Sequence, residues 1–147
     1  MQHAQAAAQA LGVRLQILGA RNPGEIDSAF AAMTTEKAGG VIVVVDAMLQ
    51  NNRARITDLA ARLRLPAVYG LSEYTDVGGL LAYGPNRLAM FRRAVSYIDR
   101  ILKGARPGDL PVERPTQFAL IVNLKAARTL GLTIPPQVLL RADTVLE

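Results

Sequence analysis

The chain has 147 residues, half of them apolar, which is enough to bury one hydrophobic core and is most simply a single domain. Cysteine is absent and His3 is the only histidine, which excludes disulfides, the usual zinc sites and the Cys/His or Ser/His pairs of nucleophilic enzymes. The 17 basic residues outnumber the 12 acidic ones, but no basic run carries interleaved aromatic residues, which argues against a nucleic-acid partner. We therefore expect no metal, no cofactor and no enzymatic activity.

The N-terminal part of the chain predicts a helix, a strand and a second helix. An alanine-rich helix ends at Gly12, and residues 13–18 (VRLQIL) alternate apolar and polar as in a half-buried strand. Asn22 and Pro23 are typical of a helix start, and the apolar face of that helix consists of Ile26, Ala29, Phe30 and Met33. This N-terminus lacks the basic and apolar regions of a secretory signal, and no apolar run in the chain approaches the roughly 20 residues that cross a bilayer.

Residues 39–46 (GGVIVVVD) predict the central strand of the fold. Five consecutive branched apolar residues without polar alternation indicate a strand that is buried on both faces of a parallel sheet. Asp46 closes this strand at the carboxyl edge, where ligands bind in open α/β sheets. An acid in this position also suits the cap of a following helix, and position alone does not decide between the two roles.

The middle of the chain repeats the same order of elements. A helix with an apolar face is stopped by Pro66, and two short strands follow at residues 67–70 and 79–83, separated by a loop that contains Glu73. Asn86 then caps a long helix that ends at Gly104. We expect the apolar stripe of this helix to be buried, and it consists of Phe91, Ala94, Val95, Ile98, Ile101 and Leu102. The element order predicts an α/β, Rossmann-like, three-layer domain with a mostly parallel sheet.

The chain changes character after Arg106. Three prolines interrupt residues 106–115, which therefore cannot form one regular element. A strand at residues 118–122 (FALIV), a helix at 123–130 and a short helix at 137–141 follow. We expect this tail to return to a different sheet.

The last 38 residues, LPVERPTQFALIVNLKAARTLGLTIPPQVLLRADTVLE, form a specific signature. Its distinctive parts are Pro115-Thr116, Asn123-Leu124-Lys125, Leu130-Gly131-Leu132, Ile134-Pro135-Pro136 and Leu140-Arg141-Ala142-Asp143. This run closely resembles the C-terminal signature of a family of ABC-transporter substrate-binding proteins, among them proteins associated with uptake of tryptophan and other amino acids. Upstream, the strand that ends at Asp46 and the run Tyr83-Gly84-Pro85-Asn86 also resemble parts of that family.

The resemblance implies a two-lobed binding protein of the type I periplasmic-binding-protein class, which traps a solute between two Rossmann-like lobes by hinge closure. Residues 1–106 then correspond to the second ligand-binding lobe, and residues 107–147 to a connector and a crossover tail that completes the first lobe. The first lobe and any leading signal or lipoprotein segment are not in this sequence. The implied full-length parent is periplasmic or anchored outside the cytoplasm, and its protein partner is an ABC permease.

The resemblance also suggests which residues face the solute, most simply an amino acid or a related amine. Asp46 falls where relatives place an acid that pairs with a ligand amine, and a charge-assisted hydrogen bond is stronger than a neutral one. Glu73 is a second acid for the cleft, and Tyr83 offers a ring and a hydroxyl. Met48 is a further candidate, although a methionine in this place is more often plain packing.

Two other functions fit the same architecture. The lobe also serves as the effector-sensing part of transcription regulators, although no helix-turn-helix segment is visible, and a truncated lobe without independent binding is the third alternative. If residues 118–122 normally pair in an absent lobe, their uncovered edge invites pairing between molecules. We therefore predict a homodimer, or a larger assembly, that shares or exchanges its C-terminal tails.

Overall fold

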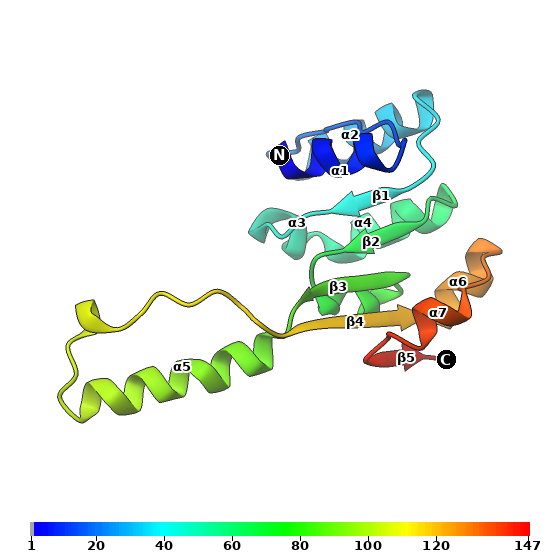
Figure 1. Ribbon diagram of the computed structural model, residues 1–147. Helices are drawn as coiled ribbons and strands as arrows, with labels where there is room; N and C mark the ends of the chain where they lie inside the picture. Colours follow the sequence, from blue (N-terminus) through cyan, green and yellow to red (C-terminus); the bar gives the residue numbers. More distant parts are fainter. Residues whose placement is uncertain (1) are drawn as a thin grey trace.

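A computed structural model describes residues 2–147, and its centre is one five-stranded sheet in the order β1-β2-β3-β4-β5 (Figure 1). The first three strands run parallel, β4 is antiparallel to β3, and β5 is parallel to β4. Their bounds are β1 Val41–Val43, β2 Ala67–Tyr69, β3 Leu81–Pro85, β4 Phe118–Asn123 and β5 Thr144–Leu146. The predicted fold class, a mixed α/β fold with a mostly parallel sheet, is confirmed.

The described chain also forms seven α-helices and two 3-10 helices, of which α1 and α2 precede the first strand. The α-helices are α1 Gln2–Ala10, α2 Pro23–Thr35, α3 Ala47–Asn51, α4 Arg53–Arg62, α5 Arg87–Leu102, α6 Leu124–Leu130 and α7 Pro136–Leu139, and the 3-10 helices are η1 Ser72–Val77 and η2 Pro107–Asp109. Helices α2 and α4 and the η1 turn pack on one face of the sheet. The buried core there consists of Ile26, Phe30, Val43, Ile56, Ala60, Leu65, Ala67, Tyr69 and Tyr74.

Short polar side chains start four of these helices. Asn22, Asp46, Asn86 and Asn123 each occupy an N-cap, and each side-chain oxygen accepts the backbone N–H three residues later. This bond satisfies one of the free N–H groups that every helix start exposes. The sequence predicted the caps at Asn22 and Asn86, and left the cap at Asp46 open. The structure confirms the first two and shows that Asp46 caps α3.

The prediction that the central strand is buried on both faces is wrong. Val43 is buried against the core, but Ile42, on the opposite face, is 73% exposed. Strand β1 also ends at Val43, and Val44 and Val45 lie exposed beyond it. The run of branched residues therefore identified the strand correctly. It did not reveal that no other element packs on the face that contains Ile42.

The expected strand at residues 13–18 does not form either. The segment does not pair with β1, so its apolar and its polar side chains both stay on the surface. Its apolar side chains Val13, Leu15, Ile17 and Leu18 are exposed. Arg14 instead anchors the segment to the end of α2, because its guanidinium donates to the Glu36 carbonyl at 2.9 Å and pairs with the Glu36 carboxylate at 3.2 Å.

The expectation that the tail returns to a different sheet is also wrong. Strand β4 pairs with β3 over five residues, from Leu81 opposite Val122 to Pro85 opposite Phe118. Its other side is occupied by β5, which the sequence did not predict. Because β3 pairs along one side of β4 and β5 pairs with residues 121–123 on the other, most of the edge is occupied, which weakens the premise for exchanged C-terminal tails.

Helix α5 and the connector that follows it project away from the sheet (Figure 1). The connector is tied back to the helix, since Arg93 pairs with Glu113 at 2.5 Å and the Tyr97 hydroxyl donates to the Pro111 carbonyl at 2.8 Å. The predicted burial of the α5 stripe is wrong, because no residue of this helix is buried. Its exposed apolar residues are Leu88, Met90, Phe91, Val95, Ile98, Ile101 and Leu102.

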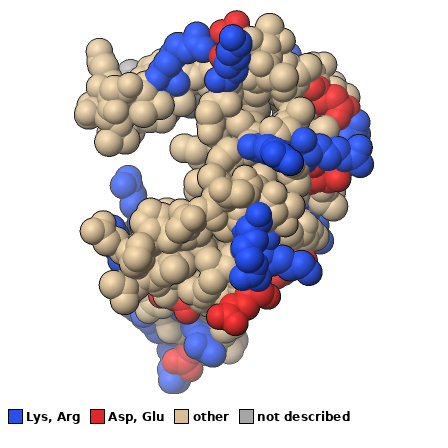
Figure 2. Space-filling view, turned by 90° about the vertical axis from the view of Figure 1, so that its right-hand side faces the viewer, with Lys and Arg blue, Asp and Glu red and all other residues tan. Residues whose placement is uncertain are grey.

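Charge is distributed over the surface without one dominant patch. Figure 2 shows Lys and Arg interspersed with Asp and Glu on the face in view, and a hollow on one side whose walls are mainly uncharged. Six ion pairs join residues of opposite sign in the described part of the chain. No described helix is both long enough and apolar enough to span a membrane.

Candidate functional site

The carboxyl ends of β1, β2 and β3 meet at one edge of the sheet. Gly70 directly follows β2 and Gly84 lies near the end of β3, and the chain passes each of them so closely that a side chain there would collide with its neighbours. A Cβ on Gly84 would lie 2.1 Å from the Gly70 carbonyl oxygen, and a Cβ on Gly70 would lie 2.7 Å from Val45. The two glycines therefore allow three strand ends to converge, and this edge is the candidate site.

Asp46 lies at this edge and caps α3. One carboxylate oxygen, Oδ1, accepts the Leu49 N–H at 3.0 Å, and the residue is exposed. The cap thus uses one oxygen and leaves the second, Oδ2, without a hydrogen bond from the described residues. The two roles that the sequence left open for Asp46 do not exclude each other.

Glu73 lies in η1 at the same edge, but it already has partners. Its carboxylate forms an ion pair with Arg87, the first residue of α5, and accepts the Ser72 hydroxyl at 3.2 Å. Partial burial raises the pKa of Glu73, but its backbone N–H, Arg87 and Ser72 together outweigh this effect and hold the pKa below its usual value. Glu73 therefore stays ionised and links the loop after β2 to the start of α5.

Tyr74 fills the space behind Asp46. It stacks on Tyr69 with ring centroids 4.4 Å apart, and its hydroxyl is buried without a hydrogen-bond partner. Burial, then repulsion from Tyr69 and from Asp46, raises the pKa of Tyr74 to about 12 against the opposing charge of Arg53. Gln50, one turn beyond Asp46, also has a buried side-chain oxygen without a partner. The edge thus contains polar groups that the chain itself does not satisfy.

Met48 and Tyr83 differ in their surroundings. Met48 is half-buried on α3 and packs against the core, which agrees with plain packing. Tyr83 lies on the uncovered face of the sheet, 56% exposed, where its ring stacks on Phe118 of β4 at 5.7 Å. Its ring is open to a ligand or to another surface.

A model of the ABC transporter substrate-binding protein family matches residues 1–146. The chain belongs to this family. The family consists of substrate-binding proteins rather than enzymes, and no group of three His, Cys, Asp or Glu side chains among residues 2–147 could hold a metal ion. A comparison with curated proteins finds no match.

Solved structures resemble this chain over almost its full length. A conserved domain protein from Vibrio cholerae and the ABC domain of a Streptococcus pneumoniae protein in complex with L-Trp are each 26% identical to it, with a TM-score of 0.88 over 99% of this chain and 49% of theirs. The ligand-free, open form of a substrate-binding protein with adhesive properties from Clostridium difficile shares the fold, at 19% identity and a TM-score of 0.68 over 99% of this chain and 48% of its own. The chain thus spans about half the length of these structures.

Within this family member, the structure brings Asp46 and Glu73 to one edge of the sheet, with Met48 packed against the core beside it and Tyr83 on the uncovered sheet face. Sequence reasoning missed Arg87, which neutralises Glu73, and the close approach of Gly70 and Gly84. A signal for the glycines was present, because each follows a tyrosine at the end of a strand, in the pairs Tyr69-Gly70 and Tyr83-Gly84. Arg87 gave a weaker signal as a basic residue directly after a helix cap.

Proposed function

We propose that this chain is one lobe of the solute-binding component of an ABC import system, and that it binds an amino acid or a related amine at the carboxyl edge of its sheet. Membership of the substrate-binding family supports the solute-binding role. The structural neighbour in complex with L-Trp supports the amino-acid class. The chain spans 49% of that neighbour, and the proposal assigns the second wall of the cleft to another lobe.

The observation that carries this proposal is the state of Asp46. Its exposed carboxylate uses one oxygen for the α3 cap and keeps the other for a ligand ammonium group. Glu73 is less suited to this task because Arg87 already neutralises it. We assign Asp46 as the amine contact and Glu73 as a residue that holds the edge together. Tyr83 supplies an exposed ring beside the cleft, and Met48 supports α3 from within the core.

Isothermal titration of the two-lobed parent with L-tryptophan, and with its deaminated analogue indole-3-propionate, tests the assignment. If Asp46 binds the amine, L-tryptophan binds more tightly than the analogue, and Asp46→Asn removes most of that difference. Equal affinities in the unmodified protein would refute the amine contact.

We further propose that the parent acts outside the cytoplasm and delivers its solute to an ABC permease. The homodimer stays a prediction, although it can no longer rest on a free edge of β4. Light scattering at micromolar concentration decides it, and a monomer would refute it. The alternative of a regulator domain is disfavoured because the family match is to transport proteins.

A further inference from the structure

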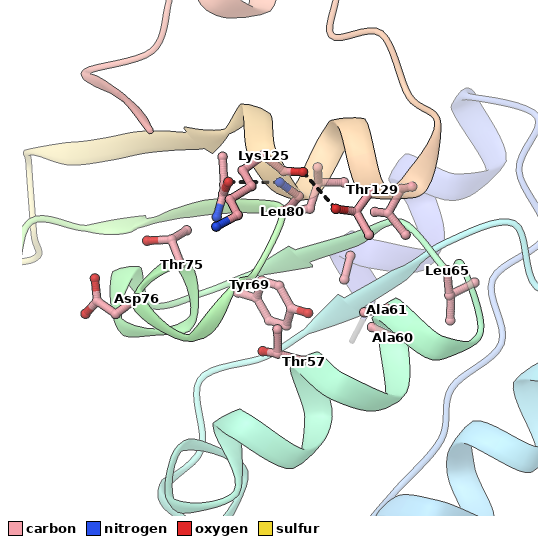
Figure 3. A pocket seen from close by; sticks show the side chains of 15 residues that line it. Thr57, Ala60, Ala61, Leu65, Tyr69, Thr75, Asp76, Leu80, Lys125 and Thr129 are labelled. Carbon is pink, nitrogen blue, oxygen red and sulfur yellow. Dashed lines mark hydrogen bonds between the residues drawn. The ribbon is translucent and has the colours of Figure 1, made fainter. Parts of the chain in front are cut away.

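A second concave site lies away from the cleft edge. It is a groove of about 350 Å³ between α4 and α6, on the helix-covered face of the sheet (Figure 3). Such a volume lies within the usual range of small-molecule sites. None of Asp46, Met48, Glu73 and Tyr83 lines it. A ligand in this groove would therefore not compete directly with one at the cleft.

One end of the groove carries two charges of opposite sign. Figure 3 shows Asp76 and Lys125 near Thr75 at this end. Neither Asp76 nor Lys125 forms an ion pair within residues 2–147. Asn123 also lines the groove, and its side-chain oxygen is occupied by the α6 cap, which leaves the amide nitrogen to face a ligand acceptor. This end thus offers a cation, an anion and an amide donor.

The opposite end is apolar. Ala60, Ala61 and Leu65 lie there in Figure 3, and Leu130 completes the lining. Between the two ends lies Thr57, which is only 5% exposed. Burial raises the pKa of the neighbouring Tyr69, and a side-chain hydrogen bond between Tyr69 and Thr57 opposes that rise. The polar contacts of a ligand therefore lie at the charged end of the groove.

We propose that this groove is a second ligand site, for a zwitterionic α-amino acid with an aliphatic side chain. The ligand carboxylate binds Lys125 and the Asn123 amide, its ammonium binds Asp76, and its side chain lies toward Leu65. Because Asp76 and Lys125 are both exposed, a ligand with a single charge would gain only one of the two charge-assisted contacts and should bind more weakly than the zwitterion. This site is independent of the proposed cleft function.

The test is a titration of the ¹⁵N-labelled chain, followed by its amide NMR shifts. The probes are L-leucine, 4-methylpentanoate, which lacks the ammonium group, and 3-methylbutylamine, which lacks the carboxylate. We expect L-leucine to shift the amides of Thr57, Asn123, Lys125 and Thr129 and to bind about 10-fold more tightly than either analogue, the factor that one charge-assisted hydrogen bond supplies. Shifts confined to residues around Asp46, or no shifts with L-leucine, would overturn the proposal.

Variants locate the site independently of the cleft. Lys125→Gln should weaken L-leucine about 10-fold, whereas the control Arg128→Gln, on the same helix but outside the groove, should not change its affinity. Ala61→Phe fills the groove and should abolish binding, and its control is Ala54→Phe on the exposed side of α4. Unaltered affinity in Lys125→Gln would refute the site even if Ala61→Phe failed to fold.

Discussion

Two substitutions at Asp46 separate its role in folding from its role in binding. Asparagine keeps a side-chain oxygen that accepts the Leu49 N–H and therefore keeps the α3 cap, but it lacks the negative charge. Alanine removes both. We therefore expect Asp46→Asn to change the free energy of unfolding by less than about 0.5 kcal/mol and Asp46→Ala to lower it by about 1 kcal/mol.

The effect on binding follows the charge rather than the cap. Loss of a charge-assisted hydrogen bond costs about 1.5 to 3 kcal/mol, which corresponds to roughly one to two decades in the affinity for an amino-acid ligand. Both variants should therefore lose a similar affinity, although only Asp46→Ala loses stability.

Urea denaturation of this chain measures the stabilities, and titration calorimetry of the two-lobed parent with L-tryptophan measures the affinities. Asn123→Ala provides the control, because it removes an equivalent cap on α6, and β4 is antiparallel to β3 and so ends at the opposite edge of the sheet. It should cost about 1 kcal/mol in stability and nothing in affinity. If Asp46→Asn bound L-tryptophan as tightly as the unmodified protein, the assignment of Asp46 as the amine contact would be wrong.

Three further predictions concern the same edge and the helix beside it. Gly84→Ala should destabilise the chain by about 3 kcal/mol in urea titrations, because its Cβ would lie 2.1 Å from the Gly70 carbonyl oxygen. The control is Gly19→Ala, at a position where a Cβ meets no other atom, and it should leave stability unchanged. Equal effects of the two substitutions would disprove the close approach. Tyr74→Phe removes a buried hydroxyl without a partner and should be neutral or stabilising by up to about 1 kcal/mol at pH 7. Because the pKa of Tyr74 is raised to about 12 in the folded chain, the unfolded chain ionises first and stability falls between about pH 10 and pH 12. This fall should be less steep in Tyr74→Phe than in the parent, and parallel pH curves would contradict it. A double-mutant cycle of Glu73→Gln and Arg87→Gln should give a coupling free energy of about 0.5 kcal/mol at pH 7. This coupling should disappear when acid protonates Glu73, below the lowered pKa of that carboxylate. A coupling that persisted in acid would rule out the ion pair as its source.

The sequence predicted best what neighbouring residues determine. Asn22 and Asn86 cap helices as expected, because a cap needs only a side chain and an N–H three residues away. The order of strands and helices from residue 22 to residue 104 followed for the same reason, since periodicity and turn residues are local signals.

The errors concern contacts between distant parts of the chain. The pairing of β4 with β3 joins residues about 35 positions apart, and nothing within residues 118–122 specifies which sheet they enter. The face that Ile42 exposes depends in the same way on helices elsewhere in the chain. At the site, the sequence identified both acids at the strand ends, but the ion pair of Glu73 with Arg87 requires the loop after β2 to meet the start of α5.

The excursion formed by α5 and its connector leaves and re-enters the sheet at neighbouring points. The Asn86 N–H donates to the Gln117 carbonyl at 2.9 Å directly above the pair Pro85–Phe118, and the ties at Arg93 and Tyr97 brace the two arms further out. If only one strand of chain joined α5 to the sheet, the helix could rotate freely about it. Because both the start of α5 and the end of the connector are held at the sheet, rotation is restricted and bending is the easier motion. The attachment point of α5 lies next to the ion pair of Arg87 with Glu73. A protein that bound the exposed apolar stripe of α5 and bent the helix would therefore also displace the strand ends that hold the candidate site.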